Sequence, residues 1–283
     1  MTQTSAFMSD IDKHNWNEIK GYSVRSAEPN KPLYLIKTDE TMHAAGGMVS
    51  TAKDLTKFIK AQINLGKLGN EQIIASEVMK KSHQTLTENK HARGYPKYGW
   101  GWAVVELYNQ KLLEHRGGFA GASTYMSFMP EKKMGLIVLS NQDKWGGDLA
   151  YAIEAIAYAI LLGKSSEEVS HIVTDNENYI LNKVEKFYAT KTSKPAAVKA
   201  KLKLPIEGRY QNELLGSIEV TFSDNEGYSL EWGNLKSQLY QSENANDLDV
   251  EFRPNLRQPI VFLSASNHNT YLEFNDHRFT LMK

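Results

Sequence analysis

The stretch that decides the fold is LLEHRGGFAGAS at residues 112–123. Its apolar start predicts a β-strand, and the glycines that follow favour a tight turn back into a second strand. Short apolar runs at residues 98–106 and 134–140, separated from it by polar turns, extend the pattern on both sides. Short runs joined by tight turns are typical of a meander, so we expect consecutive antiparallel strands over residues 98–140.

Two helices are expected to flank this sheet. Residues 50–63 place apolar side chains at helical spacing, and either Ser50 or Thr51 is a natural N-cap. Residues 147–163 form a strongly apolar stretch with helical periodicity that can cover the sheet. The pattern therefore predicts an α+β fold, an antiparallel sheet with flanking helices.

Composition suggests three parts along the 283 residues. We expect a sheet-and-helix domain over residues 1–163 and a charged helical linker over residues 164–203. Residues 204–283 consist of short β segments separated by turns, which predicts a small all-β, barrel-like domain. This last part carries twice as many acidic as basic residues, although the whole chain is neutral, with 33 of each. A neutral chain without a basic stripe argues against a nucleic-acid partner.

Composition also excludes several other kinds of site. The chain has no cysteine, which rules out disulfides, thiolate catalysis and cysteine-based metal sites. No apolar run reaches the roughly 20 residues of a membrane span. The first residues lack the basic start and apolar core of an export signal, so they do not define a compartment. We expect neither a metal nor another cofactor, because no metal-ligand spacing with carboxylates is found for His43, His83, His91, His268 and His277.

The residues His115-Arg116-Gly117 and the segments on both sides of them resemble motifs of one particular family. The step is similar to the third active-site motif, His-x-Gly or Lys-Thr-Gly, of the serine β-lactamase and D-alanyl-D-alanine carboxypeptidase superfamily, on its class C-like branch. The element GGMVSTAKDL at residues 46–55 resembles the same family, and LPIEGRYQN at 204–212 resembles the start of a barrel-like domain often appended to it. The resemblance implies an incomplete β-lactamase/transpeptidase-like fold followed by that small domain.

In the family this strand lines the active-site cleft, and the resemblance implies a role for three residues. His115 would contact a substrate carboxylate or relay a proton near the nucleophile. Gly117 would let the substrate approach the strand, and the backbone N–H of Gly118 would supply one donor of the oxyanion hole. Arg116, by strand alternation, would point away from the cleft.

The first two motifs of the family, a nucleophile in Ser-x-x-Lys and a Tyr-x-Asn, are not found in their usual order. Residues 50–53 fit the first pattern, but their context matches a structural helix start. Residues 210–212 fit the second, but they come last, inside the β domain. Such a nucleophile needs its lysine one helical turn away in a desolvated pocket. We therefore interpret Ser50 as part of a helix start and Tyr210 as a packed tyrosine.

The function that this resemblance implies is that of a portion of a bacterial, β-lactamase-related serine hydrolase that acts on amide or ester bonds through an acyl-enzyme. Its substrate would be a small molecule or peptide: a β-lactam, a D-Ala-D-Ala peptide or an ester. A missing N-terminal segment would associate with this chain and supply the nucleophile, and the chain alone would be inactive. Full-length members of the family are expected in the periplasm or outside the cell. Two alternatives stay open, a non-catalytic peptide or cell-wall binding protein that retains the cleft wall, and a rearranged nucleophile at Ser50 and Lys53.

Overall fold

The computed structural model describes residues 1–26, 29–40, 46–88, 96–190, 196–242, 247–253, 256–264 and 270–282. Contacts divide the chain into two units, Met1–Tyr22 with Ile36–Thr190 and Ser23–Leu35 with Lys191–Lys283. Three of the histidines considered as metal ligands, His43, His91 and His268, lie outside the described residues. The boundaries expected at residues 163 and 203 stay a prediction.

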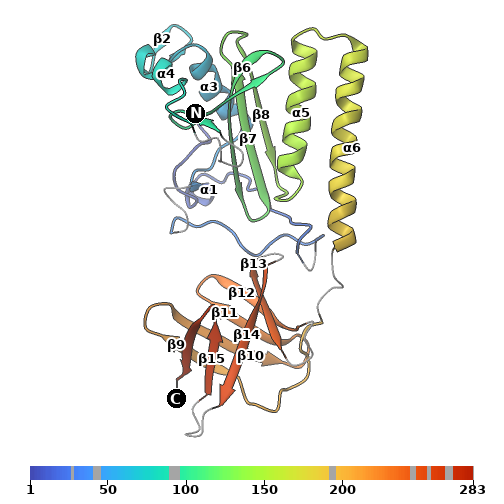
Figure 1. The fold of residues 1–283 in the computed structure, drawn as a ribbon. Coiled ribbons are helices and arrows are strands. Elements are labelled where there is room, and N and C mark those ends of the chain that lie inside the picture. Colours follow the sequence, from blue (N-terminus) through green and yellow to red (C-terminus); the bar gives the residue numbers. More distant parts are fainter. Residues whose placement is uncertain are drawn as a thin grey trace. The chain divides into compact units, whose positions relative to one another are not determined.

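The first unit is built on an antiparallel sheet of six strands in the order β3-β4-β5-β6-β7-β8 (Figure 1). Each strand pairs with the next one along the chain, so the meander expected from the sequence is confirmed. The strands are β3 (Thr87–Glu88), β4 (Lys97–Tyr98), β5 (Ala103–Leu107), β6 (Gln110–Phe119), β7 (Ala122–Met129) and β8 (Met134–Ser140).

Helices α3 and α5 cover opposite faces of this sheet (Figure 1). On one face Leu113 and Phe128 pack with Ile59 of α3. On the other face the neighbouring positions Leu112 and Met129 pack on α5. Successive strand residues point to opposite faces, so the same strands build two apolar layers. The helices are α1 (Asp10–Lys13), α3 (Ala52–Ile63), α4 (Ser76–Ser82), α5 (Gly146–Leu161) and α6 (Ser166–Thr190), and a small hairpin joins β1 (Lys67–Leu68) to β2 (Glu71–Gln72).

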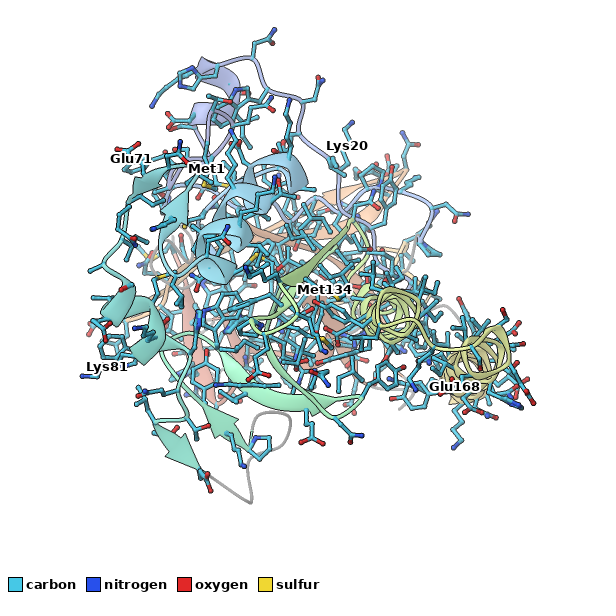
Figure 2. All side chains as sticks on the ribbon, turned by 90° about the horizontal axis from the view of Figure 1, so that it is seen from above. Met1, Lys20, Glu71, Lys81, Met134 and Glu168 are labelled. Atoms are coloured by element: carbon cyan, nitrogen blue, oxygen red, sulfur yellow. The ribbon has the colours of Figure 1, made fainter. Side chains whose placement is uncertain are left out.

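Helix α6 packs along α5 and lies on the side of α5 away from the sheet, as the view down the two helices in Figure 2 shows. The α+β class with flanking helices is therefore confirmed. No helix in the described part of the chain has an apolar stretch long enough to cross a bilayer.

The second unit is a closed antiparallel barrel in the order β10-β11-β12-β13-β14-β15-β16-β9. Its interior is filled by side chains, because Trp232 meets Phe252, Phe274 and Phe279 edge-on with ring centroids 5.7–6.1 Å apart. The barrel-like domain expected from the sequence is confirmed. The strands are β9 (Gly208–Asn212), β10 (Gly216–Ser223), β11 (Gly227–Trp232), β12 (Leu235–Gln241), β13 (Leu248–Arg253), β14 (Leu256–Ser264), β15 (Thr270–Phe274) and β16 (His277–Leu281).

A residue from early in the chain forms hydrogen bonds with this barrel. Tyr34 belongs to the second unit by its contacts, and its hydroxyl accepts from the Lys236 N–H at 2.9 Å and donates to the Phe252 carbonyl at 2.7 Å. The pairing of β12 with β13 stops at Leu239 and Val250, and the two backbone groups that Tyr34 contacts lie beyond this last pair. One phenol therefore bridges the place where the two strands separate.

The start of α3 is held by a cap and by the N-terminal segment. Thr51 is the N-cap, and its hydroxyl accepts from the Asp54 N–H at 3.2 Å. The buried Asp54 carboxylate in turn accepts from the Gln3 N–H at 2.7 Å and from the Thr4 hydroxyl at 3.0 Å. Ser50 lies outside the cap, with its hydroxyl 2.8 Å from that of Thr4. Of the two expected caps, the structure therefore selects Thr51.

We expect Thr51→Ala to lower the free energy of unfolding by about 1 kcal/mol, the usual cost of a lost N-cap. Ser50→Ala serves as the matched control and should cost about 0.5 kcal/mol or less, because it removes one hydroxyl contact and no cap. Urea unfolding of both variants measures the difference. A larger loss for Ser50→Ala than for Thr51→Ala would contradict this assignment of the cap.

The N-terminal segment crosses the turn between β6 and β7 at two facing glycines. The Tyr22 N–H donates to the Asn141 carbonyl at 2.9 Å and lies 3.3 Å from the Gly121 carbonyl. A Cβ on Gly21 would lie 2.9 Å from the Gly121 carbonyl oxygen, and a Cβ on Gly121 would lie 2.7 Å from the Gly21 carbonyl carbon. Gly121 also has a φ of +78°, in the left-handed region. The crossing therefore requires glycine on both sides.

Gly121→Ala should lower the free energy of unfolding by about 2–3 kcal/mol, because it combines an unfavourable φ with a backbone clash. Gly147→Ala, in the first turn of α5 with open space around it, is the control and should be neutral or slightly stabilising. Chemical denaturation of the two variants tests this. Equal stabilities would show that the crossing does not depend on the missing side chains.

Candidate functional site

The second half of β6 is an open strand edge. Strand β5 pairs with β6 only as far as the Ala103–Glu114 pair. From His115 to Phe119, β6 pairs with β7 alone among the described strands. From Gly117 to Phe119 its other edge has no described strand beside it, and backbone N–H and C=O groups at such an edge can pair with a further extended chain.

His115 stands at the start of this open edge, on the α3 face of the sheet. It is half-buried and paired with Met126 of β7, which packs in the same layer as Phe128. Its ring meets the ring of Tyr98 from β4 edge-on, with centroids 6.1 Å apart. This contact orients the imidazole beside the edge.

The two glycines of the motif differ in what surrounds them. A Cβ on Gly117 would lie 2.7 Å from the Thr124 hydroxyl, whereas one on Gly118 would meet the Ala122 carbonyl at an ordinary 3.5 Å. The pair Phe119–Ala122 closes a hairpin with a two-residue turn, and such closing pairs exchange hydrogen bonds. From this alternation we infer that the N–H of Gly118 is directed away from β7, towards the open edge.

A cavity of about 480 Å³ lies on the α5 side of the same strand end. Arg116 faces it with its guanidinium over the Tyr151 ring, 5.4 Å from the centroid. Lys144 and Lys183 add two further cations, while Asp143 and Asp148 supply two carboxylates. Positive charge therefore exceeds negative charge in the lining, and the backbone of Gly117 and Gly118 forms part of the wall.

The charges of this cavity are partly paired. Lys183 of α6 forms an ion pair with Asp148 of α5. Partial burial lowers the pKa of Lys183, but the hydrogen bond to Asp148 outweighs it, so the pKa is raised and the ammonium group stays charged. The Oδ1 atom of Asp143 is buried without a hydrogen-bond partner in the described structure, while its other oxygen lies 3.4 Å from the Gly121 N–H.

Sequence reasoning missed most of this lining. Strand alternation correctly places Arg116 on the face opposite His115. That face was not expected to hold a cavity, yet Arg116 lines one there together with Gly117 and Gly118. Lys183 comes from α6, far along the chain, and no local pattern connects it with β6. Of the cavity residues that the sequence did not predict, only Lys144 has a position from which its place in the lining could have been expected, because it follows β8 closely.

The other two motif matches lie apart from this edge. Ser50 contacts Thr4 at the start of α3, and Lys53 is exposed. Tyr210 is fully buried in the barrel, where its hydroxyl donates to the Ile206 carbonyl at 2.9 Å. Their surroundings are those of a helix start and of a packed tyrosine.

The described histidines and carboxylates form no group that could hold a metal ion. His83, one of the histidines considered for such a role, has its Nε2 atom 2.9 Å from the Gln62 amide oxygen and packs edge-on against Phe128. Burial, with a smaller contribution from Lys111, lowers the pKa of His83 to about 4. His83 is therefore a neutral structural residue near neutral pH.

Several solved structures are similar to the chain, among them the following three. The octameric penicillin-binding protein homologue from Pyrococcus abyssi is 21% identical, with a TM-score of 0.47 and coverage of 99% of this chain and 56% of its own. The structure of SurE is 16% identical, with a TM-score of 0.40 and coverage of 93% and 55%. SurE with D-Leu is 15% identical, with a TM-score of 0.35 and coverage of 85% and 52%. The chain thus spans little more than half the length of the solved structures that it matches.

The sequence comparisons identify the family directly. No curated protein matches the chain. The family model described as Beta-lactamase matches residues 6–161, which is more than half of the chain and includes the sheet of the first unit with α3 and α5. The resemblance stated from the sequence is confirmed, and the chain belongs to the Beta-lactamase family.

Proposed function

We propose that the open edge of β6 and the adjoining cavity form the substrate-binding wall of an acyl-transfer site in a serine hydrolase. The observation that carries the proposal is the end of β6 from Gly117 to Phe119, which pairs with β7 alone among the described strands and includes two exposed glycines. An extended substrate adds to such an edge through backbone hydrogen bonds and fixes the position of its reacting carbonyl. The nucleophile would come from residues outside this sequence.

Each residue of the edge then has a chemical role. The Gly118 N–H, directed away from β7, would donate to the oxygen of the reacting carbonyl as negative charge develops on it. The absence of a side chain at Gly117 would leave room for the substrate backbone. His115, at the start of the edge, would contact the substrate or relay a proton near the nucleophile.

The cavity supports a substrate that carries a carboxylate. Arg116, Lys144 and Lys183 outnumber the carboxylates of the lining, and a planar guanidinium suits a carboxylate group well. D-Ala-D-Ala peptides and β-lactams both have a carboxylate close to the bond that is attacked. An ester without an anionic group would use the edge but not these cations.

Strand β8 and helix α5 present a surface on which a further segment could dock. Strand β8 ends the sheet among the described strands, and its sequence MGLIVLS contains no charged residue. Next to it α5 exposes Leu149, Ile153 and Ile160 at helical spacing. An uncharged edge beside an apolar helix stripe favours the addition of a strand and a helix. We propose that the segment with Ser-x-x-Lys and Tyr-x-Asn includes these elements.

The product of the longest open reading frame that contains this chain provides the test. Treated with a fluorophosphonate or a reporter β-lactam, this product should be acylated on a serine outside the present sequence. Chain 1–283 alone should stay unlabelled, because loss of the nucleophile removes about 10⁶ in rate.

Variants of the longer product test the individual roles. His115→Ala should lower kcat/KM about 100-fold, whereas the exposed His171→Ala and Ser50→Ala should leave it unchanged. Acylation of Ser50 would contradict the proposal. A longer product that binds D-Ala-D-Ala peptides without being acylated would also contradict it, and would favour the non-catalytic binding protein.

A further inference from the structure

Two buried glutamates share one tyrosine hydroxyl on the α5 face of the sheet. The hydroxyl oxygen of Tyr125 on β7 lies 2.6 Å from Oε2 of Glu114 on β6 and 2.8 Å from Oε2 of Glu154 on α5. Glu114 and Glu154 are each 5% exposed, and Tyr125 is 2% exposed. These three residues, here called the Glu-Tyr-Glu triad, join two strands to the helix that covers them.

The distances imply a count of protons. A phenol has one proton to donate, and an ionised carboxylate can only accept. Two contacts of hydrogen-bond length at one hydroxyl therefore favour an arrangement in which one carboxyl group is protonated and donates to the tyrosine oxygen. The other carboxylate then accepts the tyrosine proton. In this arrangement the triad holds one negative charge and one carboxyl proton.

The charged groups nearest the triad are those of the cavity that Tyr125 also lines, the cations Arg116, Lys144 and Lys183 and the carboxylates Asp143 and Asp148. Neither Glu114 nor Glu154 takes part in any ion pair formed by the described residues. On β6, Arg116 faces the same side, and its guanidinium lies over the Tyr151 ring. The Oε1 atom of Glu154 is buried without a partner in the described structure.

The remaining neighbours of the triad are hydroxyl groups, apolar side chains and one more distant cation. On α5, Tyr158 has its hydroxyl 3.2 Å from that of Ser127. Beyond β5, the Tyr108 hydroxyl donates to the Ala155 carbonyl at 3.0 Å, and Lys164 lies over the Tyr108 ring. The residues of β8 in this layer, Met134 and Leu136, are apolar.

We propose that the Glu-Tyr-Glu triad is a pH-sensitive clamp, which holds α5 on β6 and β7 while it keeps its shared proton and loosens α5 when that proton is lost. Ionisation of both carboxyl groups would place two negative charges around one hydroxyl that can satisfy only one of them. Separation of α5 from the strands is the way to bring water to the second carboxylate.

The sign of the pH effect follows from burial. Burial, opposed by hydrogen bonds from Ser127 and Tyr125 and assisted by the charge of Glu114, raises the pKa of Glu154 from 4.5 to about 7. Between these two values the folded chain binds more protons than the unfolded chain, so stability falls as the pH rises. The clamp is therefore closed in mild acid and opens as the pH passes about 7.

The clamp acts beside the candidate site. Glu114 directly precedes His115 on β6, and Tyr125 pairs across the sheet with Arg116. Tyr125 and Arg116 also line the cavity with excess positive charge. Loss of the shared proton would thus alter the strand edge and the cavity together, whatever substrate they bind.

Carbon-13 NMR of the full chain, labelled at the glutamate carboxyl carbons, tests the proposal directly. One glutamate should titrate near pH 7, and hydrogen exchange of the α5 amides, corrected for its intrinsic pH dependence, should accelerate about tenfold over the same range. Glu106→Gln, at an exposed position on β5, should change neither result. A wild-type chain in which every glutamate titrates below about pH 5.5 would overturn the proposal.

Two variants distinguish a shared proton from burial of one carboxyl group. Glu154→Gln should abolish the titration and keep α5 protected at pH 8, because the amide donates to the tyrosine oxygen as the protonated acid does. Glu114→Gln should move the step to lower pH, because the Glu114 charge is gone and Tyr125 can then donate to Glu154 alone, while burial still raises the pKa of Glu154. A titration of Glu154 that persists unchanged in Glu114→Gln would show that no proton is shared.

Discussion

The antiparallel pairing of β6 with β7 is the interaction on which the rest of the first unit depends. Alternation along these two strands sends Leu113 and Phe128 to α3 and Leu112 and Met129 to α5, so both apolar layers are built on the same ladder. Strand β5 begins at the pair of Ala103 with Glu114, whereas β7 stays paired with β6 as far as the turn, so the end of β6 has β7 as its one described strand neighbour. A shift of one residue would exchange the two faces and move every group discussed above.

The same alternation separates two kinds of chemistry at the end of the sheet. His115 lies on the α3 face beside Tyr98, while Arg116 and Tyr125 lie on the α5 face beside the cavity. Gly117 and Gly118, which follow Arg116, have no side chains. A chain bound along the edge at these glycines is therefore within reach of both faces of the sheet. One strand end thus brings together exposed backbone, an imidazole and a cationic pocket.

Much of this could be predicted from the sequence, because the informative patterns are local. The strands around residues 112–123, the helix over residues 50–63 and an all-β, barrel-like domain at the end of the chain all follow from periodicity and turn residues. The features that could not be predicted depend on residues far apart in the chain. Lys183 meets Asp148 between two helices, and Tyr34 inserts between β12 and β13 from some 200 positions earlier. Periodicity contains no signal for such partners, because it reports the face of an element and not what covers it.

We propose that this chain forms the wall of an acyl-transfer site whose nucleophile is encoded elsewhere. The most direct test is the DNA sequence immediately upstream of the Met1 codon. The account predicts an open frame that runs into this codon and encodes Ser-x-x-Lys followed by Tyr-x-Asn. An in-frame stop codon with a ribosome-binding site just before Met1 would contradict it.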